Sequence, residues 1–141
     1  MIGILLAGHG YTAEGMLKTV PMFFSNEKQI DAVSVHENTN LDDFKNEVRQ
    51  KNSELDTGDG VLILTDLLGG SPCTAVISLM NERVDVIAGL NLSMLLSVIA
   101  ARSSGMSRSQ IAAQAVNEAE KGIVNVGKVL KQENDSTYQN R

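Results

Sequence analysis

Three short stretches of this sequence carry groups suited to phosphate chemistry. They are Gly8-His9-Gly10, Asp66 and Gly69-Gly70-Ser71. A neutral imidazole is a nucleophile near neutral pH, and a carboxylate that accepts a hydrogen bond from one ring nitrogen leaves the other nitrogen free to react. Backbone N–H groups and a hydroxyl at the start of a helix can bind phosphate oxygens. The combination predicts a histidine that accepts a phosphoryl group.

These stretches follow short apolar runs that are typical of β-strands. The sequence predicts strands at residues 2–7, 30–35, 61–65 and 84–88, separated by longer segments of helical periodicity. Such alternation is typical of βα units wound around a parallel sheet. We therefore expect an α/β fold in which helices flank both faces of a mainly parallel central sheet. Because loops beyond the carboxyl ends of parallel strands carry function, Asp66 is expected within reach of His9.

Polar side chains mark where the helices should begin. Asn40 predicts one helix N-cap, and Ser71 before Pro72 predicts another. Ser107 is expected to open the last helix, which runs towards Val129. The chain after Lys131 is polar, so residues 1–131 are expected to form one domain and residues 132–141 a disordered tail.

Taken singly, each chemical signal has an ordinary structural explanation. A lone histidine is usually a solvated polar residue, an aspartate after a strand can cap a turn, and two glycines before Ser-Pro commonly start a helix. His9 stands out because the glycines on both sides leave its imidazole open to a large partner. His36 lacks such neighbours and is interpreted as a surface residue. Cys73 is interpreted as a small buried hydrophobe.

The composition excludes several classes of protein. A chain of 141 residues with 43% hydrophobic residues has the size of one domain with a real core. The net charge of -5, from 17 acidic and 12 basic residues, argues against a nucleic-acid partner. The single cysteine excludes an intrachain disulfide and a thiolate metal cluster, and favours a reducing compartment. The apolar run at residues 2–7 is too short to span a membrane and lacks the features of a signal peptide.

The motifs occur in an order and spacing that resemble one family. Gly8-His9-Gly10, Asp66 with Gly69-Gly70-Ser71-Pro72, and residues 86–95 together resemble the mannose-family IIA domain of the bacterial phosphoenolpyruvate-dependent sugar phosphotransferase system. The resemblance covers residues 1–131. It implies a phosphotransferase that acts through a phosphohistidine on His9, with Asp66 hydrogen-bonded to that histidine and Ser71 in the active-site loop.

The resemblance also implies partners and a location. The phosphoryl donor is the phosphocarrier protein HPr, and the acceptor is a IIB domain on a separate polypeptide, which serves the membrane components IIC and IID during sugar uptake. Family members are homodimers that exchange a C-terminal antiparallel strand. Residues 122–126 are the candidate for that strand, and they fit the end of the last helix equally well. The chain is expected in the cytoplasm, peripheral to the membrane through the permease, with no metal, nucleotide or other cofactor.

Three other functions fit parts of the sequence. Residues 8–13 satisfy the loose dinucleotide-binding pattern G-x-G-x-x-A, with Glu37 ending the second strand, but that function assigns no role to Asp66. A regulatory relative, or a phosphodonor for a dihydroxyacetone kinase, would use the same histidine, although the phosphodonor branch departs from the Gly-Gly-Ser-Pro stretch. A binding module without catalysis would not depend on His9. The sequence does not indicate which sugar is transported.

Overall fold

The central sheet has four parallel strands. The computed structural model describes residues 1–139, with side chains through residue 134. The strands β1 (Gly3–His9), β2 (Ile30–Val35), β3 (Val61–Thr65) and β4 (Val84–Ala88) form one sheet in the order β2-β1-β3-β4. The predicted α/β fold with a parallel sheet is confirmed. β1 continues beyond its predicted end at Ala7, so His9 itself is the last residue of the strand.

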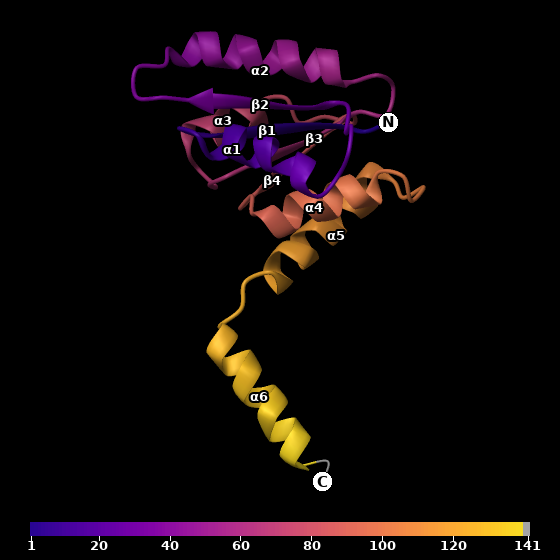
Figure 1. The fold of residues 1–141 in the computed structure, drawn as a ribbon. Helices are drawn as coiled ribbons and strands as arrows, with labels where there is room; N and C mark the ends of the chain where they lie inside the picture. The colour runs from indigo at the N-terminus through magenta and orange to yellow at the C-terminus, as the bar shows by residue number, and fades with distance from the viewer. Residues whose placement is uncertain (140–141) are drawn as a thin grey trace.

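Helices cover both faces of the sheet (Figure 1). One face packs against α1 (Thr12–Thr19), its 3-10 extension η1 (Val20–Met22), α4 (Leu92–Ala101) and α5 (Arg108–Lys121). The other face packs against α2 (Leu41–Leu55) and α3 (Ser71–Ile77). The predicted placement of helices on both faces is therefore confirmed.

Burial on both faces explains the composition of the central strands. Successive side chains of a strand point to opposite faces, so Ile4 and Leu6 join the core beneath α1, α4 and α5, whereas Leu5 and Ala7 join the core beneath α2 and α3. All five residues of β3 are buried as well. A strand that is covered on both sides must be apolar throughout, which is why these runs show no polar alternation.

The strand order creates a switch point between β1 and β3. From β1 the chain passes through α1 to β2 on one side, and the later crossovers lead to β3 and β4 on the other side. In open α/β sheets, such a reversal leaves a crevice beyond the carboxyl ends of the two central strands, and ligands bind there. The topology therefore marks the ends of β1 and β3 as the place for a site.

Two of the three predicted caps begin a helix. The Asn40 side chain accepts hydrogen bonds from two backbone N–H groups of α2, at 2.9 and 3.1 Å, and Ser107 forms a capping box at α5. The prediction of Ser71 as a cap is wrong, because Gly70 is the N-cap of α3 and Ser71 is its first helical residue. Pro72 is compatible with this position, because it lies in the first turn of the helix. Backbone N–H groups in that turn have no partner within the helix, so the N–H that proline lacks is not needed there.

The C-terminal part is not the single long helix that the sequence predicted. α5 ends at Lys121, residues 122–125 form a connection, and α6 (Val126–Gln139) leads away from the body of the molecule (Figure 1). Asn125 explains the restart, because its side chain accepts a hydrogen bond from the Lys128 N–H at 3.2 Å. The helical prediction across residues 122–125 is therefore wrong.

α6 extends into the segment that was predicted to form the tail. Residues 132–139 continue this helix, and residues 140–141 lie outside the described part of the chain, so the disorder of the tail stays a prediction. The end of the domain at residue 131 and the exchange of a C-terminal strand stay predictions. Within residues 1–139, no helix is both long and apolar enough to cross a membrane.

Candidate active site

His9 and Asp66 meet at the switch point of the sheet. His9 ends β1, whose neighbours in the sheet are β2 and β3. Asp66 comes directly after β3, and the last register pair of these two strands is Ala7 with Thr65. Parallel pairing therefore carries both functional residues to the same edge, although 57 positions separate them in the sequence.

The Asp66 carboxylate holds His9 by its ring and by its backbone. Nδ1 of His9 lies 3.1 Å from Oδ1 and 3.2 Å from Oδ2 of Asp66, and the His9 backbone N–H donates to Oδ2 at 2.8 Å. A carboxylate only accepts hydrogen bonds, so in the neutral ring Nδ1 would carry the proton and Nε2 would keep its lone pair. The Asp66 side chain is 14% exposed and that of His9 is 44% exposed. The ring is therefore fixed in one tautomer and still accessible from outside.

The glycines beside His9 serve close approach and a tight turn. A Cβ atom at Gly8 would lie 3.2 Å from Oδ2 of Asp66 and 3.2 Å from the backbone nitrogen of Ala13. Gly10 adopts a φ of 56°, in the left-handed region, and donates its N–H to the Val35 carbonyl at 2.8 Å. Both glycines thus keep the chain compact around the histidine.

Gly70 lies directly against the imidazole. A Cβ atom built at this position would come within 2.6 Å of Cε1 and 3.0 Å of Nε2 of His9. The backbone of Gly70 has a φ of -76°, which any residue can adopt. The need for glycine here therefore comes from the neighbouring ring and not from the backbone conformation.

Gly69 and Ser71 line a different hollow from the one that His9 lines. They surround a cavity of about 160 Å³ between α2 and α3, together with Lys45 and Thr74. The structure thus brings Gly8, Gly10 and Gly70 close to His9, and places Ser71 in the lining of the other hollow. The role of Ser71 and Gly69 in phosphate binding stays a prediction.

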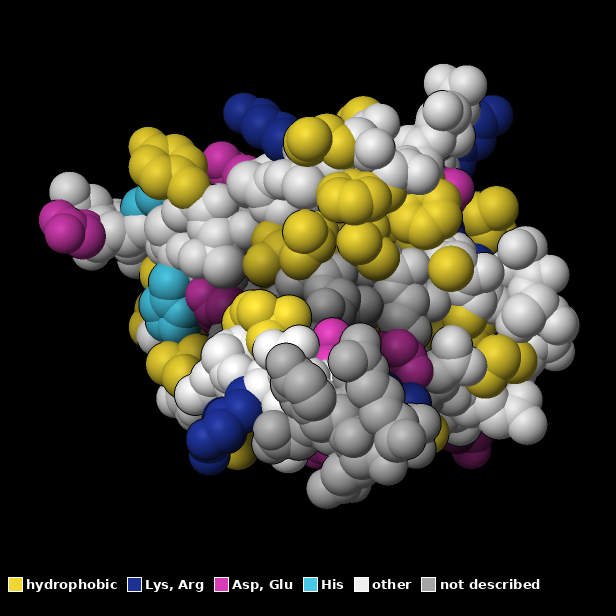
Figure 2. Space-filling view, turned by 60° about the horizontal axis from the view of Figure 1, so that its bottom comes forward, with side chains coloured by type: hydrophobic (Ala, Val, Ile, Leu, Met, Phe, Trp, Pro, Cys, Tyr) yellow, Lys and Arg dark blue, Asp and Glu magenta, His cyan; other side chains and the backbone are white. Residues whose placement is uncertain are grey.

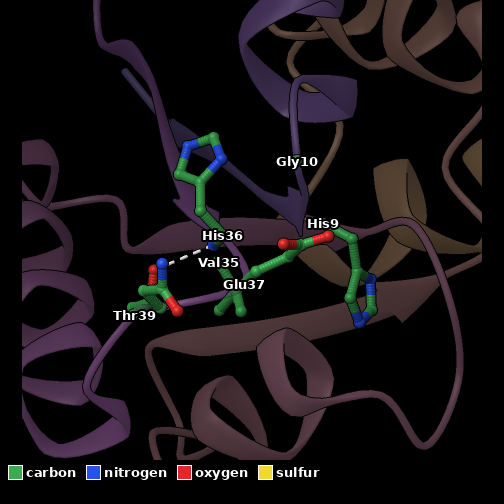
Figure 3. A pocket seen from close by; sticks show the side chains of 7 residues that line it. His9, Gly10, Val35, His36, Glu37 and Thr39 are labelled. Atoms are coloured by element: carbon green, nitrogen blue, oxygen red, sulfur yellow. Dashed lines mark hydrogen bonds between the residues drawn. The ribbon is translucent and has the colours of Figure 1, made fainter.

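The pocket at His9 is completed by a loop that the sequence did not single out. This open pocket of about 940 Å³ is lined by His9, Gly10 and residues 35–39 (Figure 3). The His36 ring is exposed and makes an edge contact with Tyr11, with ring centroids 5.3 Å apart. Its interpretation as a surface residue is correct, and its place in the wall of this pocket was missed. The sequence carried no local signal for this placement, because it follows from the pairing of β2 with β1, which makes Val35 the register partner of His9.

The fold and the site define a small α/β protein that presents a carboxylate-bound histidine at the carboxyl edge of its sheet. The family model described as the fructose IIA component of the phosphotransferase system (PTS) matches residues 3–116. The chain belongs to this family of PTS IIA components. This membership confirms the resemblance and favours it over the dinucleotide-binding alternative.

Similar proteins come from several bacteria. The mannose-specific EIIAB component of Escherichia coli K12 is 32% identical over 124 residues, which is 86% of this chain and 38% of the relative. The fructose-specific EIIA component of Bacillus subtilis is 30% identical over 72% of this chain and 71% of the relative. The chain thus spans well under half the length of the E. coli relative.

Solved structures show the same fold. A PTS IIA protein associated with the fucose utilization operon of Streptococcus pneumoniae superposes with a TM-score of 0.80 at 30% identity, over 91% of this chain and 95% of that chain. The EIIA component of Streptococcus agalactiae superposes with a TM-score of 0.82 at 23% identity, over 91% of this chain and 99% of that chain. The second likeness concerns the fold alone.

Proposed function

We propose that this chain is a phosphoryl carrier that accepts a phosphoryl group from phospho-HPr on Nε2 of His9 and passes it to a IIB domain. The observation that carries the proposal is the pair of contacts between Nδ1 of His9 and the Asp66 carboxylate, at 3.1 and 3.2 Å. These contacts leave Nε2 as the free nucleophile on an accessible ring. Family membership supports the same role, since the relatives are named as sugar phosphotransferase components.

The transfer exchanges one nitrogen–phosphorus bond for another. The lone pair of His9 Nε2 forms a bond to phosphorus while the bond from phosphorus to the donor's ring nitrogen breaks. The donor ring, protonated on its other nitrogen, leaves as a neutral imidazole with the electron pair of the broken bond. The His9 ring keeps its proton on Nδ1 and becomes cationic, and the Asp66 carboxylate offsets that charge. Transfer to the IIB acceptor is the same exchange with His9 as the leaving group.

The site is suited to this chemistry although it has few functional groups. Phosphoryl transfer needs in-line positioning and charge stabilisation more than covalent machinery. Asp66 fixes the direction of the ring, and Gly70 limits its movement from one side. In the proposed pathway the chain acts in the cytoplasm, and the IIB acceptor serves membrane components IIC and IID during sugar uptake.

We also propose that the chain forms a homodimer by exchange of a C-terminal strand. β4 is an edge strand of the sheet, and such an edge offers unpaired backbone groups to an added strand. The connection between α5 and α6 is apolar and exposed, with Ile123 at 76% and Val124 at 56% exposure. Pairing of this segment with β4 of a second copy would bury both features.

Mass spectrometry and NMR test the carrier function on the unmodified protein. The chain is incubated with phosphoenolpyruvate, enzyme I and HPr, and the intact mass is measured at neutral pH. We expect an increase by one acid-labile phosphoryl group, and NMR of the imidazole nitrogens is expected to place it on Nε2 of His9. No increase in mass, or a phosphate on Nδ1, would contradict the proposal.

Gly70→Ala is expected to slow phosphorylation of His9 by about 100-fold without loss of the fold. The new methyl group would meet Cε1 of His9 at 2.6 Å, so the ring must turn and weaken its hydrogen bond to Asp66. The rate of transfer from phospho-HPr measures the effect, and the nitrogen NMR shifts of His9 report the lost tautomer preference.

Gly15→Ala is the matched control for this substitution. Gly15 lies in α1, close in sequence to the site, and a Cβ atom there would have open space around it. Alanine in a helix is favoured over glycine by about 1 kcal/mol, so this variant should be at least as stable as the parent and equally active. Equal rates for the two variants would show that the contact between Gly70 and the ring is not required.

A further inference from the structure

The pocket at His9 has an acidic side chain in its lining. Its lining includes Glu37, at the start of the loop between β2 and α2, and no Lys or Arg among the described residues. Figure 3 shows the Glu37 side chain extending towards His9, whereas the His36 ring points the other way. Within the described residues, no hydrogen bond or ion pair joins the exposed Glu37 carboxylate to another group. The pocket therefore presents an unpaired negative charge beside the histidine.

This arrangement conflicts with the charge demand of phosphoryl transfer. Negative charge spreads over the three phosphoryl oxygens in the transition state, and proteins stabilise it with Lys, Arg or a metal ion. Lys45 is close to the active-site loop, but it lines the separate hollow with Gly69 and Ser71. In the described residues, no three His, Cys, Asp or Glu side chains are grouped to hold a metal ion. A cationic side chain of the partner would supply the positive charge that the pocket lining lacks.

We propose that Glu37 binds a cationic side chain, preferably arginine, of each protein that exchanges a phosphoryl group with His9. The inference rests on the proposed phosphoryl transfer. A guanidinium has donors enough to bind the Glu37 carboxylate and a phosphoryl oxygen at once, and such an arginine in trans is known to stabilise phosphoryl transfer. Glu37 thereby positions the partner's cation and does not itself touch the reacting atoms.

The same carboxylate discriminates between donors. Without a partner, its charge repels free anionic phosphate donors from the pocket. A partner with a basic residue beside its own reactive group turns this repulsion into attraction, and the net charge of -5 on the chain steers such partners towards it. Glu37 is therefore a residue that determines specificity for partner proteins that carry a basic residue beside their reactive group.

Glu37→Gln tests the inference with two donors that should respond in opposite directions. With phospho-HPr at low ionic strength, the second-order rate of His9 phosphorylation is expected to fall about tenfold, and the difference should largely vanish near 1 M salt. With phosphoramidate, a small anionic donor, the rate is expected to rise, because the repelling charge is gone. Glu37→Lys should enlarge both effects, since it places a cation in the pocket and repels the partner's cation.

Glu47→Gln is the matched control, because it removes one exposed carboxylate from α2 that does not line the pocket. This variant is expected to follow the parent with both donors. A Glu37→Gln rate with phospho-HPr equal to that of Glu47→Gln would overturn the inference and leave the carrier function intact. If the parent protein takes no phosphate from either donor, the carrier function fails and the inference fails with it.

Discussion

Replacing His9 with glutamine is expected to give a folded protein that takes up no phosphate from phospho-HPr. The side chain lies at the end of β1, is 44% exposed and contributes to neither core, so its loss should leave the fold intact. Glutamine retains polarity and hydrogen-bonding capacity but has no nucleophilic nitrogen lone pair. Intact mass after incubation with phosphoenolpyruvate, enzyme I and HPr measures the result, and circular dichroism checks the fold.

His36→Gln is the control for that experiment, because His9 and His36 are the two histidines of the chain and both line the same pocket. His36 has no contact with Asp66 in the structure, and its backbone N–H donates to Oγ1 of Thr39 at 2.8 Å. The His36→Gln variant should therefore still take up one phosphate. Uptake by His9→Gln, or its loss only in His36→Gln, would move the phosphorylation site away from His9.

Asp66→Asn is expected to slow phosphoryl transfer to His9 by up to about 10⁴-fold, which is the effect of losing the orienting carboxylate of a catalytic triad. The amide of this variant would have a single acceptor oxygen, whereas the carboxylate contacts both the ring nitrogen and the backbone N–H of His9. If its NH₂ group faces Nδ1, the ring proton moves to Nε2 and removes the nucleophilic lone pair. The cationic phosphorylated ring also loses the charge that offsets it.

The rate of transfer from phospho-HPr measures this effect, and imidazole NMR shifts separate a changed tautomer from a lost fold. Asp42→Asn is the matched control. Asp42 carries an exposed carboxylate in the first turn of α2, so this substitution also removes one negative charge. That variant should transfer phosphate at the parent rate. An Asp66→Asn protein with the parent rate would show that Asp66 only supports the turn after β3.

Local patterns were sufficient to predict the strands and the starts of α2 and α5. The segments at residues 30–35, 61–65 and 84–88 became β2, β3 and β4 within the predicted bounds. The central strand β3 is apolar throughout because it is buried on both faces, whereas the edge strands β2 and β4 carry polar residues between apolar ones. Asn40 and Ser107 were recognised as caps because a side chain there bonds to N–H groups only two or three residues away. Such interactions are encoded locally.

Two predictions made from local patterns were wrong. Ile123 and Val124 continue the apolar periodicity of α5, so the prediction ran through a break that the side chain of Asn125 creates. At α3, serine was preferred over glycine as the cap, although Gly70 is the residue that fits against the His9 ring. In the second case, a contact between distant segments outweighed the local preference.

By itself, the sequence determined which chemical groups were present and the elements that carry them. A histidine between glycines after a strand and an aspartate after another strand were enough to predict a nucleophile and its orienting carboxylate. The tertiary structure decided which nitrogen of His9 contacts Asp66 and which loop faces the histidine. Both depend on the strand order β2-β1-β3-β4, which brings Asp66 to one side of His9 and Glu37 to the other. That order is set by how all the helices and strands pack together, so it is a property of the whole fold and not of any segment.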